Sequence, residues 1–242
     1  MENNNPLMAE QPIARRNMTV FFVVDSSGSM KGTKMDAVNS AIRSLIPDLS
    51  HIAETNVDSR ISIACMEFNE NVQWICEPTD VKDVHWVDLT ADGRTYMDMA
   101  LDSLRLKMNS HAFLPAPQYA PVVILLSDGV PSRAYKDKLA LLQQNKWWTA
   151  SIRIAISIGD DANREVLSDI VGNPEMVLTA YTPELLRDML RFVTISSSTI
   201  ASRSCAVGVG DGMDSKQSTA LQQIREYKED LQDELKDLSH GF

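Results

Sequence analysis

Apolar and polar positions along the chain form blocks that predict strands and helices in turn. "MTVFFVVD" (18–25) is a nearly continuous apolar run, as is typical of a central strand covered on both faces. "KMDAVNSAIRSLIPDL" (34–49) has apolar residues at helical spacing and predicts an amphipathic helix that Pro47 helps to end. Two further strands, 59–69 and 71–78, are joined so closely that we expect a hairpin with an antiparallel edge strand.

The second half of the chain continues this alternation of strands and helices. Further strands are expected at "APVVILLSD" (120–128), "ASIRIAISIG" (150–159) and "EMVLTA" (175–180). Helices are expected over 95–108, 134–146, 162–171 and a segment that begins with an N-cap threonine, Thr182, followed by Pro183. The order predicts a three-layer, Rossmann-like α/β fold, with helices on both faces of a mainly parallel sheet that has one antiparallel edge strand.

The pattern changes near the end of the chain. "TALQQIREYKEDLQDELKDL" (219–238) predicts a strongly acidic helix whose narrow apolar stripe is interrupted by Lys228. Whether this helix packs on its own domain or docks on another molecule stays open. We expect a flexible lead-in over 1–16, the α/β domain over 17–204, and a linker with the acidic amphipathic helix over 205–242.

The charge balance narrows the class of partner. The chain has 23 basic and 33 acidic residues, a net charge of -10, which argues against binding to a nucleic-acid backbone. The same excess of acidic residues favours cations or basic partner surfaces.

The cysteines and the apolar runs indicate the cellular compartment in which the protein is expected. The three cysteines, at 65, 76 and 205, show no CxxC or Cys/His spacing, so we expect no disulfide framework and a reducing environment. "MENNNPLMAEQPIARRN" has no apolar core of the kind found in secretory signals, and the longest apolar runs are too short to span a bilayer. The expectation is a cytoplasmic protein that binds neither nucleic acid nor membrane.

A cluster of small oxygen-bearing side chains follows the first strand, in "VVDSSGSMKG" (23–32). A phosphate-binding P-loop is excluded because Gly28 and Gly32 are too close for GxxxxGK[ST]. A serine nucleophile is disfavoured, since GxSxG is absent and no histidine has a supportive setting. The histidines are at 51, 85, 111 and 240.

A metal site is the chemistry that remains. Asp25, Ser27 and Ser29 supply alternate oxygen side chains on a turn, and Asp128 ends a second buried strand. Magnesium prefers hard oxygen ligands. In layered α/β folds, ligands sit outside the carboxyl ends of the strands, where both motifs are expected.

These motifs resemble the metal-ion-dependent adhesion site (MIDAS) of von Willebrand factor A domains over about residues 17–200. The shared features are the DxSxS stretch, a threonine in a later loop, and "SDG" after an apolar strand. The threonine is Thr95 in "ADGRTYMDMAL", where Arg94 stands in place of the second glycine of the family pattern.

The resemblance implies a role for each residue. The hydroxyls of Ser27, Ser29 and Thr95 would coordinate the metal directly, while Asp25 and Asp128 would bind through water or orient those hydroxyls. The implied cation is Mg²⁺, with Mn²⁺ or Ca²⁺ as alternatives. A carboxylate from an Asp or Glu of a partner protein would complete the shell.

A narrower resemblance concerns "VFFVVDSSGSM" and the edge strand "WICEPT", which look most like bacterial TerY-type tellurite-resistance proteins. It implies a stress-response or signalling system in which the partner is a Ser/Thr kinase or a PP2C-type phosphatase. Our leading hypothesis is therefore a non-enzymatic, metal-dependent protein-interaction module. The alternatives are a metal-assisted phosphohydrolase that uses Asp25 and Asp128, and docking through the acidic tail helix.

Overall fold

The computed structural model describes residues 16–55, 59–115, 117–203 and 212–240, so most of the predicted lead-in and residues 204–211 lie outside the described residues. Across these ranges six strands form one sheet in the order β3-β2-β1-β4-β5-β6. The strands are β1 (Arg16–Asp25), β2 (Ser59–Phe68), β3 (Val72–Asp80), β4 (Val122–Ser127), β5 (Ile152–Ile158) and β6 (Val177–Ala180). Only the β2–β3 pair is antiparallel, which confirms the predicted sheet.

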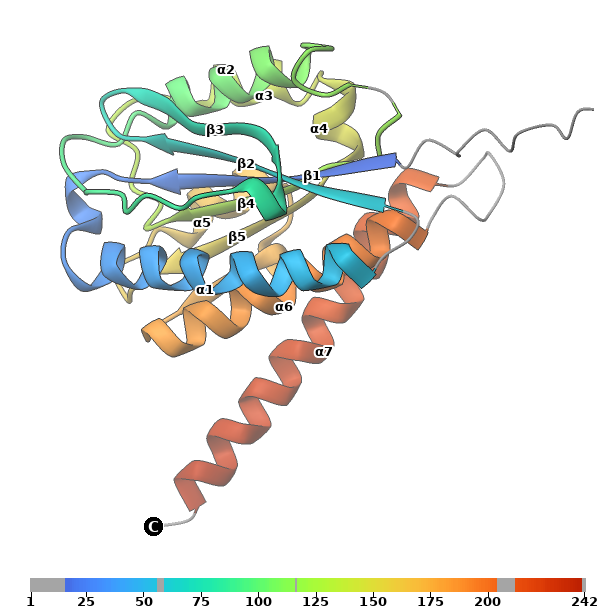
Figure 1. Ribbon diagram of the computed structural model, residues 1–242. Coiled ribbons are helices and arrows are strands. Elements are labelled where there is room, and N and C mark those ends of the chain that lie inside the picture. The colour runs from blue at the N-terminus through green and yellow to red at the C-terminus, as the bar shows by residue number, and fades with distance from the viewer. Residues whose placement is uncertain (1–15, 56–58, 116, 204–211, 241–242) are drawn as a thin grey trace, which may run out of the picture.

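Helices cover both faces of this sheet, as predicted. Figure 1 shows α1 and α6 on one face and α2, α3 and α4 on the other. The helices are α1 (Thr33–Thr55), α2 (Met97–Met108), α3 (Lys136–Leu142), α4 (Lys146–Ala150), α5 (Arg164–Val171), α6 (Pro183–Arg203) and α7 (Gly212–His240). Short 3₁₀ helices are η1 (Gly28–Met30), η2 (Val81–Asp83) and η3 (Pro174–Met176). None of the helices in the described ranges combines the length and apolar character needed to cross a membrane.

The central strand β1 ends at the same level of the sheet as its two neighbours, β2 and β4. It pairs in parallel with β2 and β4, and its apolar side chains from Val20 to Val24 are buried. Asp25 lies opposite Phe68, the last residue of β2, and Val24 lies opposite Leu126 near the end of β4. The loops after β1, β2 and β4 therefore leave the sheet side by side.

The prediction that Pro47 helps to end the first helix was wrong. Pro47 lies inside α1 on its exposed side, and the helix continues to Thr55. The residues beyond the proline explain why. Leu49 is fully buried, and Ile52 and Ala53 pack against the core, so tertiary packing outweighs the lost backbone hydrogen bond.

The single helix predicted over 134–146 is two short helices, α3 and α4. The break is at Asn145, whose side-chain oxygen accepts hydrogen bonds from the backbone N–H groups of Trp147 and Trp148. This is an N-cap arrangement, which starts a new helix rather than extending the previous one.

The acidic tail helix packs on its own domain. The ring of Tyr227 in α7 stacks on Phe192 of α6, with the ring centroids 4.1 Å apart. Lys228, which interrupts the apolar stripe, donates hydrogen bonds to the carbonyls of Glu175 and Val177 at 2.7 and 3.1 Å. Figure 1 shows the later part of α7 extending away from the sheet.

Candidate metal site

The loop after β1 presents two hydroxyl groups side by side. Asp25 is fully buried, and its Oδ1 accepts a hydrogen bond from the Ser27 N–H at 2.9 Å, which folds the chain into a tight turn. The Oγ atoms of Ser27 and Ser29 then lie 3.1 Å apart. Ser27 is buried and Ser29 is exposed, so the pair lies where the interior of the domain meets its surface.

A second hydrogen bond joins this loop to the end of β4. The Ser127 hydroxyl donates to Asp25 Oδ2 at 2.6 Å and accepts from the Gly129 N–H at 2.8 Å. Both carboxylate oxygens of Asp25 are thus engaged by protein donors. Sequence reasoning did not assign Ser127 a role, although a hydroxyl in the otherwise apolar run "VVILLS" was the available signal.

The environment of Asp25 disfavours its charged form. Burial raises the pKa of this carboxyl to about 6, against the lowering effect of the hydrogen bonds from Ser127 and Ser27. The neighbouring Asp128 carboxylate raises the pKa further. The two acidic groups are therefore close enough to repel each other, which is the electrostatic setting that a cation would relieve.

Asp128 has one carboxylate oxygen without a partner. The side chain is 1% exposed, and within the described residues its Oδ1 is buried and makes no hydrogen bond. Its Oδ2 lies 3.4 Å from the ammonium of Lys34. A buried, unsatisfied carboxylate oxygen is costly, and a cation bound to this atom would remove that cost.

Lys34, to which the sequence assigned no role, pairs with a surface carboxylate as well as with Asp128. Its Nζ lies 2.7 Å from Asp161 Oδ1. Burial lowers the pKa of Lys34, but the hydrogen bond to Asp161 and the charges of Asp128 and Asp161 outweigh it, so the pKa is raised. The ammonium therefore stays charged at neutral pH.

The loop that contains Thr95 (the threonine loop) is hydrogen-bonded to the loop after β1 that contains Ser27 and Ser29 (the serine loop). The Gly28 N–H donates to the Gly93 carbonyl at 2.8 Å, and the Asp92 N–H donates to the Ser26 carbonyl at 2.8 Å. Thr95 follows directly and is 4% exposed. A side chain at position 28 would place its Cβ 3.1 Å from the Gly93 oxygen, a tight contact, so this close approach favours glycine.

Thr95 is also tied to the loop after β4. Its N–H donates to the Ser132 hydroxyl at 3.1 Å, and its carbonyl accepts from the Ser132 N–H at 2.9 Å. Arg94 has an ordinary backbone conformation, since every positive φ among the described residues belongs to a glycine. The exposed Arg94 side chain points toward Glu70, at 3.9 Å, and the loop forms with arginine in place of the second glycine.

The oxygen atoms at this edge of the sheet suit a hard divalent cation. Neighbouring ligands of octahedral Mg²⁺, with bonds of 2.0–2.1 Å, lie about 2.9 Å apart. The Ser27 and Ser29 hydroxyls are separated by a similar 3.1 Å. Among the described residues no group of three or more His, Cys, Asp or Glu side chains could hold a metal ion. Binding here would therefore depend on hydroxyls, with Asp128 Oδ1 as the open carboxylate oxygen.

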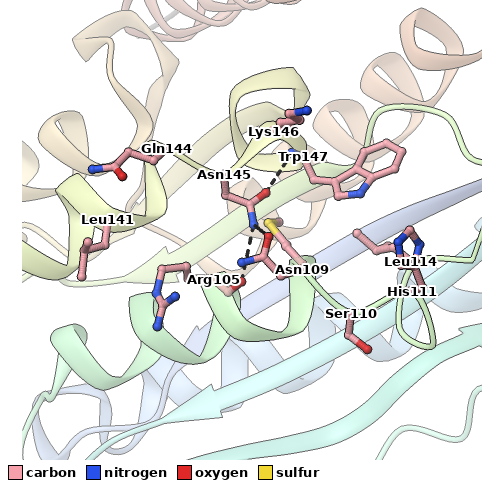
Figure 2. A pocket seen from close by; sticks show the side chains of 11 residues that line it. Arg105, Asn109, Ser110, His111, Leu114, Leu141, Gln144, Asn145, Lys146 and Trp147 are labelled. Atoms are coloured by element: carbon pink, nitrogen blue, oxygen red, sulfur yellow. Dashed lines mark hydrogen bonds between the residues drawn. The ribbon is translucent and has the colours of Figure 1, made fainter.

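A separate cavity of about 570 Å³ lies between the end of α2 and the connection from α3 to α4 (Figure 2). The length of α2, about 18 Å for its 12 residues, separates it from Thr95. In its floor, Asn145 donates to Asn109 Oδ1 at 2.8 Å, and Asn145 Oδ1 accepts from the Trp147 N–H at 2.8 Å. These polar groups join α2 to α4 and are not left open for a ligand.

Comparison with known families identifies the domain. The model of the von Willebrand factor type A domain matches residues 19–191, a range that includes all five predicted site residues. Comparison with curated proteins finds no match.

Solved structures share the fold at low identity. Proximal thread matrix protein 1 from the mussel byssus, with a zinc-occupied MIDAS motif, has a TM-score of 0.58 at 17% identity, covering 73% of this chain and 47% of that chain. A von Willebrand factor type A structure from Catenulispora acidiphila has a TM-score of 0.56 at 19% identity, covering 75% and 42%. Manganese-loaded TRAP protein of Plasmodium vivax has a TM-score of 0.50 at 20% identity, covering 71% of each chain. This chain thus spans less than half of the mussel and Catenulispora chains.

Proposed function

The chain belongs to the von Willebrand factor type A domain family, and from this premise we propose that it is a metal-dependent protein-interaction module. The hydroxyls of Ser27, Ser29 and Thr95 would hold a divalent cation, with Asp25 and Asp128 supporting them directly or through water. A cation at this position supplies an open coordination position that a carboxylate of a partner protein can fill.

The open oxygen of Asp128 is the observation that carries this proposal. Asp25 uses both carboxylate oxygens to hold the serine loop and the end of β4, at 2.9 and 2.6 Å. Asp128 Oδ1 is buried beside these loops and has no protein donor. The division of roles fits a site in which Asp25 shapes the turn and Asp128 faces the ion.

Neutral hydroxyl ligands favour recognition of an acidic side chain. Serine and threonine hydroxyls leave more of the positive charge uncompensated than carboxylates do, so a further anionic ligand is attracted. We propose Mg²⁺ as the resident cation, with Mn²⁺ or Ca²⁺ as alternatives. The zinc-occupied MIDAS of the mussel protein and the manganese-loaded Plasmodium protein support a divalent ion.

The finer proposal concerns the system in which the module acts. We propose a bacterial stress-response or tellurite-resistance setting in the cytoplasm, with a Ser/Thr kinase or PP2C-type phosphatase as the protein that supplies the Asp or Glu. The stretches "VFFVVDSSGSM" and "WICEPT" support it by their resemblance to TerY-type proteins. The role is binding rather than catalysis, and neither nucleic acid nor membrane is a partner.

Co-purification from cell extract with and without Mg²⁺ tests the function. We expect partner capture by the wild type in Mg²⁺, and its loss on chelation or in Asp128→Ala. Asp92→Ala is the matched control, because Asp92 is an exposed carboxylate on the neighbouring loop, with 83% of its side chain accessible. Capture that persists in both the chelated protein and Asp128→Ala would contradict the proposal.

Two further measurements address the other functions that the sequence left open. Turnover of a generic phosphoester that disappears in Asp25→Ala would favour the metal-assisted phosphohydrolase. Capture that survives Asp128→Ala but is lost on deletion of 212–242 would favour docking through α7.

A further inference from the structure

Lys34 connects the candidate metal site to the surface. Its ammonium lies 3.4 Å from Asp128 Oδ2 and 2.7 Å from Asp161 Oδ1. The Lys34 side chain is 18% exposed, while Asp128 is 1% and Asp161 71% exposed. One carboxylate partner of Lys34 therefore lies inside the site and the other lies in solvent.

The chain provides space for Lys34 at this position. Gly159 has a φ of +90°, and a Cβ on it would lie 2.7 Å from Lys34 Cε and 2.8 Å from Asp161 Oδ1. The absence of a side chain at 159 thus lets the lysine stem and the Asp161 carboxylate occupy the same corner. Lys34, in the first turn of α1, thus packs against the residue that follows β5 and is not a free surface charge.

A fixed ammonium at this position competes with a cation. Asp128 and Asp25 are the buried carboxylates of the site, and Lys34 already compensates part of the Asp128 charge. An ammonium donates hydrogen bonds and has no lone pair, so it cannot ligate a metal. It therefore adds positive charge beside the site without contributing a ligand, and like charges in a partly buried place repel strongly.

We propose that Lys34 sets the divalent-cation affinity of the site by competing for Asp128, and that Asp161 opposes it by drawing the ammonium toward the surface. The inference rests on the proposed function, because it assumes that a cation binds at Asp128. It assigns to Lys34 and Asp161 effects of opposite sign on the same equilibrium.

Single substitutions should change Mg²⁺ affinity in opposite directions. Lys34→Met keeps the length of the stem and removes the charge, so we expect the Mg²⁺ dissociation constant to fall about tenfold. Asp161→Asn leaves Asp128 as the main carboxylate partner of Lys34, so we expect the constant to rise about threefold, a smaller effect because Asp161 is exposed and screened. Lys34→Arg keeps the charge and should stay within threefold of the wild type.

The double variant separates this coupling from a general charge effect. If Asp161 acts through Lys34, then Lys34→Met/Asp161→Asn should bind Mg²⁺ like Lys34→Met alone. Asp160→Asn is the matched control, because Asp160 is adjacent and exposed, and in the described structure it makes no ion pair with Lys34. Its dissociation constant should not change.

Titration calorimetry of the full chain with MgCl₂ measures these constants, with thermal unfolding as the check on folding and Lys34→Gln as a second neutral variant. Opposite shifts, with the double variant equal to Lys34→Met, would support the inference. A wild type that binds none of Mg²⁺, Mn²⁺ and Ca²⁺, each titrated as its chloride, would overturn the proposed function together with it. A wild type that binds, with both single variants unchanged or both weakened, would overturn the inference alone.

Discussion

At Gly129 the main chain passes so close to the start of α5 that only a hydrogen atom fits on the α-carbon. A Cβ there would lie 2.6 Å from the Asn163 carbonyl oxygen, and the residue has a φ of +70°. The Asn163 N–H donates to the Asp128 carbonyl at 2.6 Å. The glycine therefore lets Asp128 sit against α5, and its own N–H bonds Ser127.

Gly129→Ala should be strongly destabilising. The left-handed backbone costs a residue with a Cβ about 1–2 kcal/mol, and overpacking adds about 1–3 kcal/mol, so the free energy of unfolding should fall by about 2–5 kcal/mol. Gly172→Ala is the control, since Gly172 has a φ of +84° but nothing lies within 4 Å of its Cβ. Urea unfolding should give about 1–2 kcal/mol for the control. Equal losses in the two variants would mean that the contact with Asn163 is not tight.

Motif spacing alone located the loops that the structure brings together, but not the residues that join them. DxSxS, Thr95 and the aspartate of "SDG" each stand out locally, at the ends of apolar runs. Ser127 and Lys34 matter through partners 102 and 94 residues away in the chain, Asp25 and Asp128. Such pairings depend on sheet register, which a single local pattern does not contain.

At the scale of elements, strands were predicted better than helices because their signal is simpler. β1 and β4 are short, buried apolar runs with polar ends, and their positions follow directly. The residue at which a helix ends depends on the balance between local sequence signals and packing against the rest of the domain. Pro47 is a strong local stop signal, yet the buried Leu49 and the following turn keep α1 intact.

Pro47→Ala should therefore stabilise the protein. Alanine restores a backbone N–H to the interior of α1 and removes the clash of the proline ring with the preceding turn, so we expect a gain of about 1–3 kcal/mol in the free energy of unfolding. Ser40→Ala, on an exposed position of the same helix, should change it by less than about 0.5 kcal/mol. Urea denaturation compares the two, and a loss of stability in Pro47→Ala would contradict the prediction.

At the scale of the whole molecule, the described side chains of α7 (216–233) pack on the domain from one side. Ile224 is 2% exposed, Tyr227 stacks on Phe192, and Arg225 pairs with Glu175. These contacts lie near the middle of the helix, between residues 224 and 227, and they join it to α6 and η3. The sequence left open whether the apolar stripe of this helix packs on its own domain or on another molecule. For residues 224–227, packing on its own domain is the answer.

Ile224→Ala should loosen α7 without unfolding the sheet. Truncating a buried isoleucine costs about 2–5 kcal/mol, so amide hydrogen exchange in α7 should accelerate at least tenfold. Glu229→Ala, on an exposed position of the same helix, should change exchange by less than about threefold. Equal acceleration in the two variants would mean that α7 is not held by this contact.

A cation at the candidate site should stabilise the whole domain, because its proposed ligands come from the loops after β1 and β4 and from the segment between η2 and α2. Mg²⁺ at 100 times its dissociation constant should raise the free energy of unfolding by about 2.7 kcal/mol. For a domain of this size, that corresponds to a Tm increase of about 5–10 °C. Chelation should reverse the increase, and Asp128→Asn should not respond to Mg²⁺. Asp92→Asn should respond like the wild type, since Asp92 is exposed and pairs with Lys31 at the surface. Screening of the net charge of -10 would instead stabilise all three proteins equally, and that result would place the effect of Mg²⁺ outside the site.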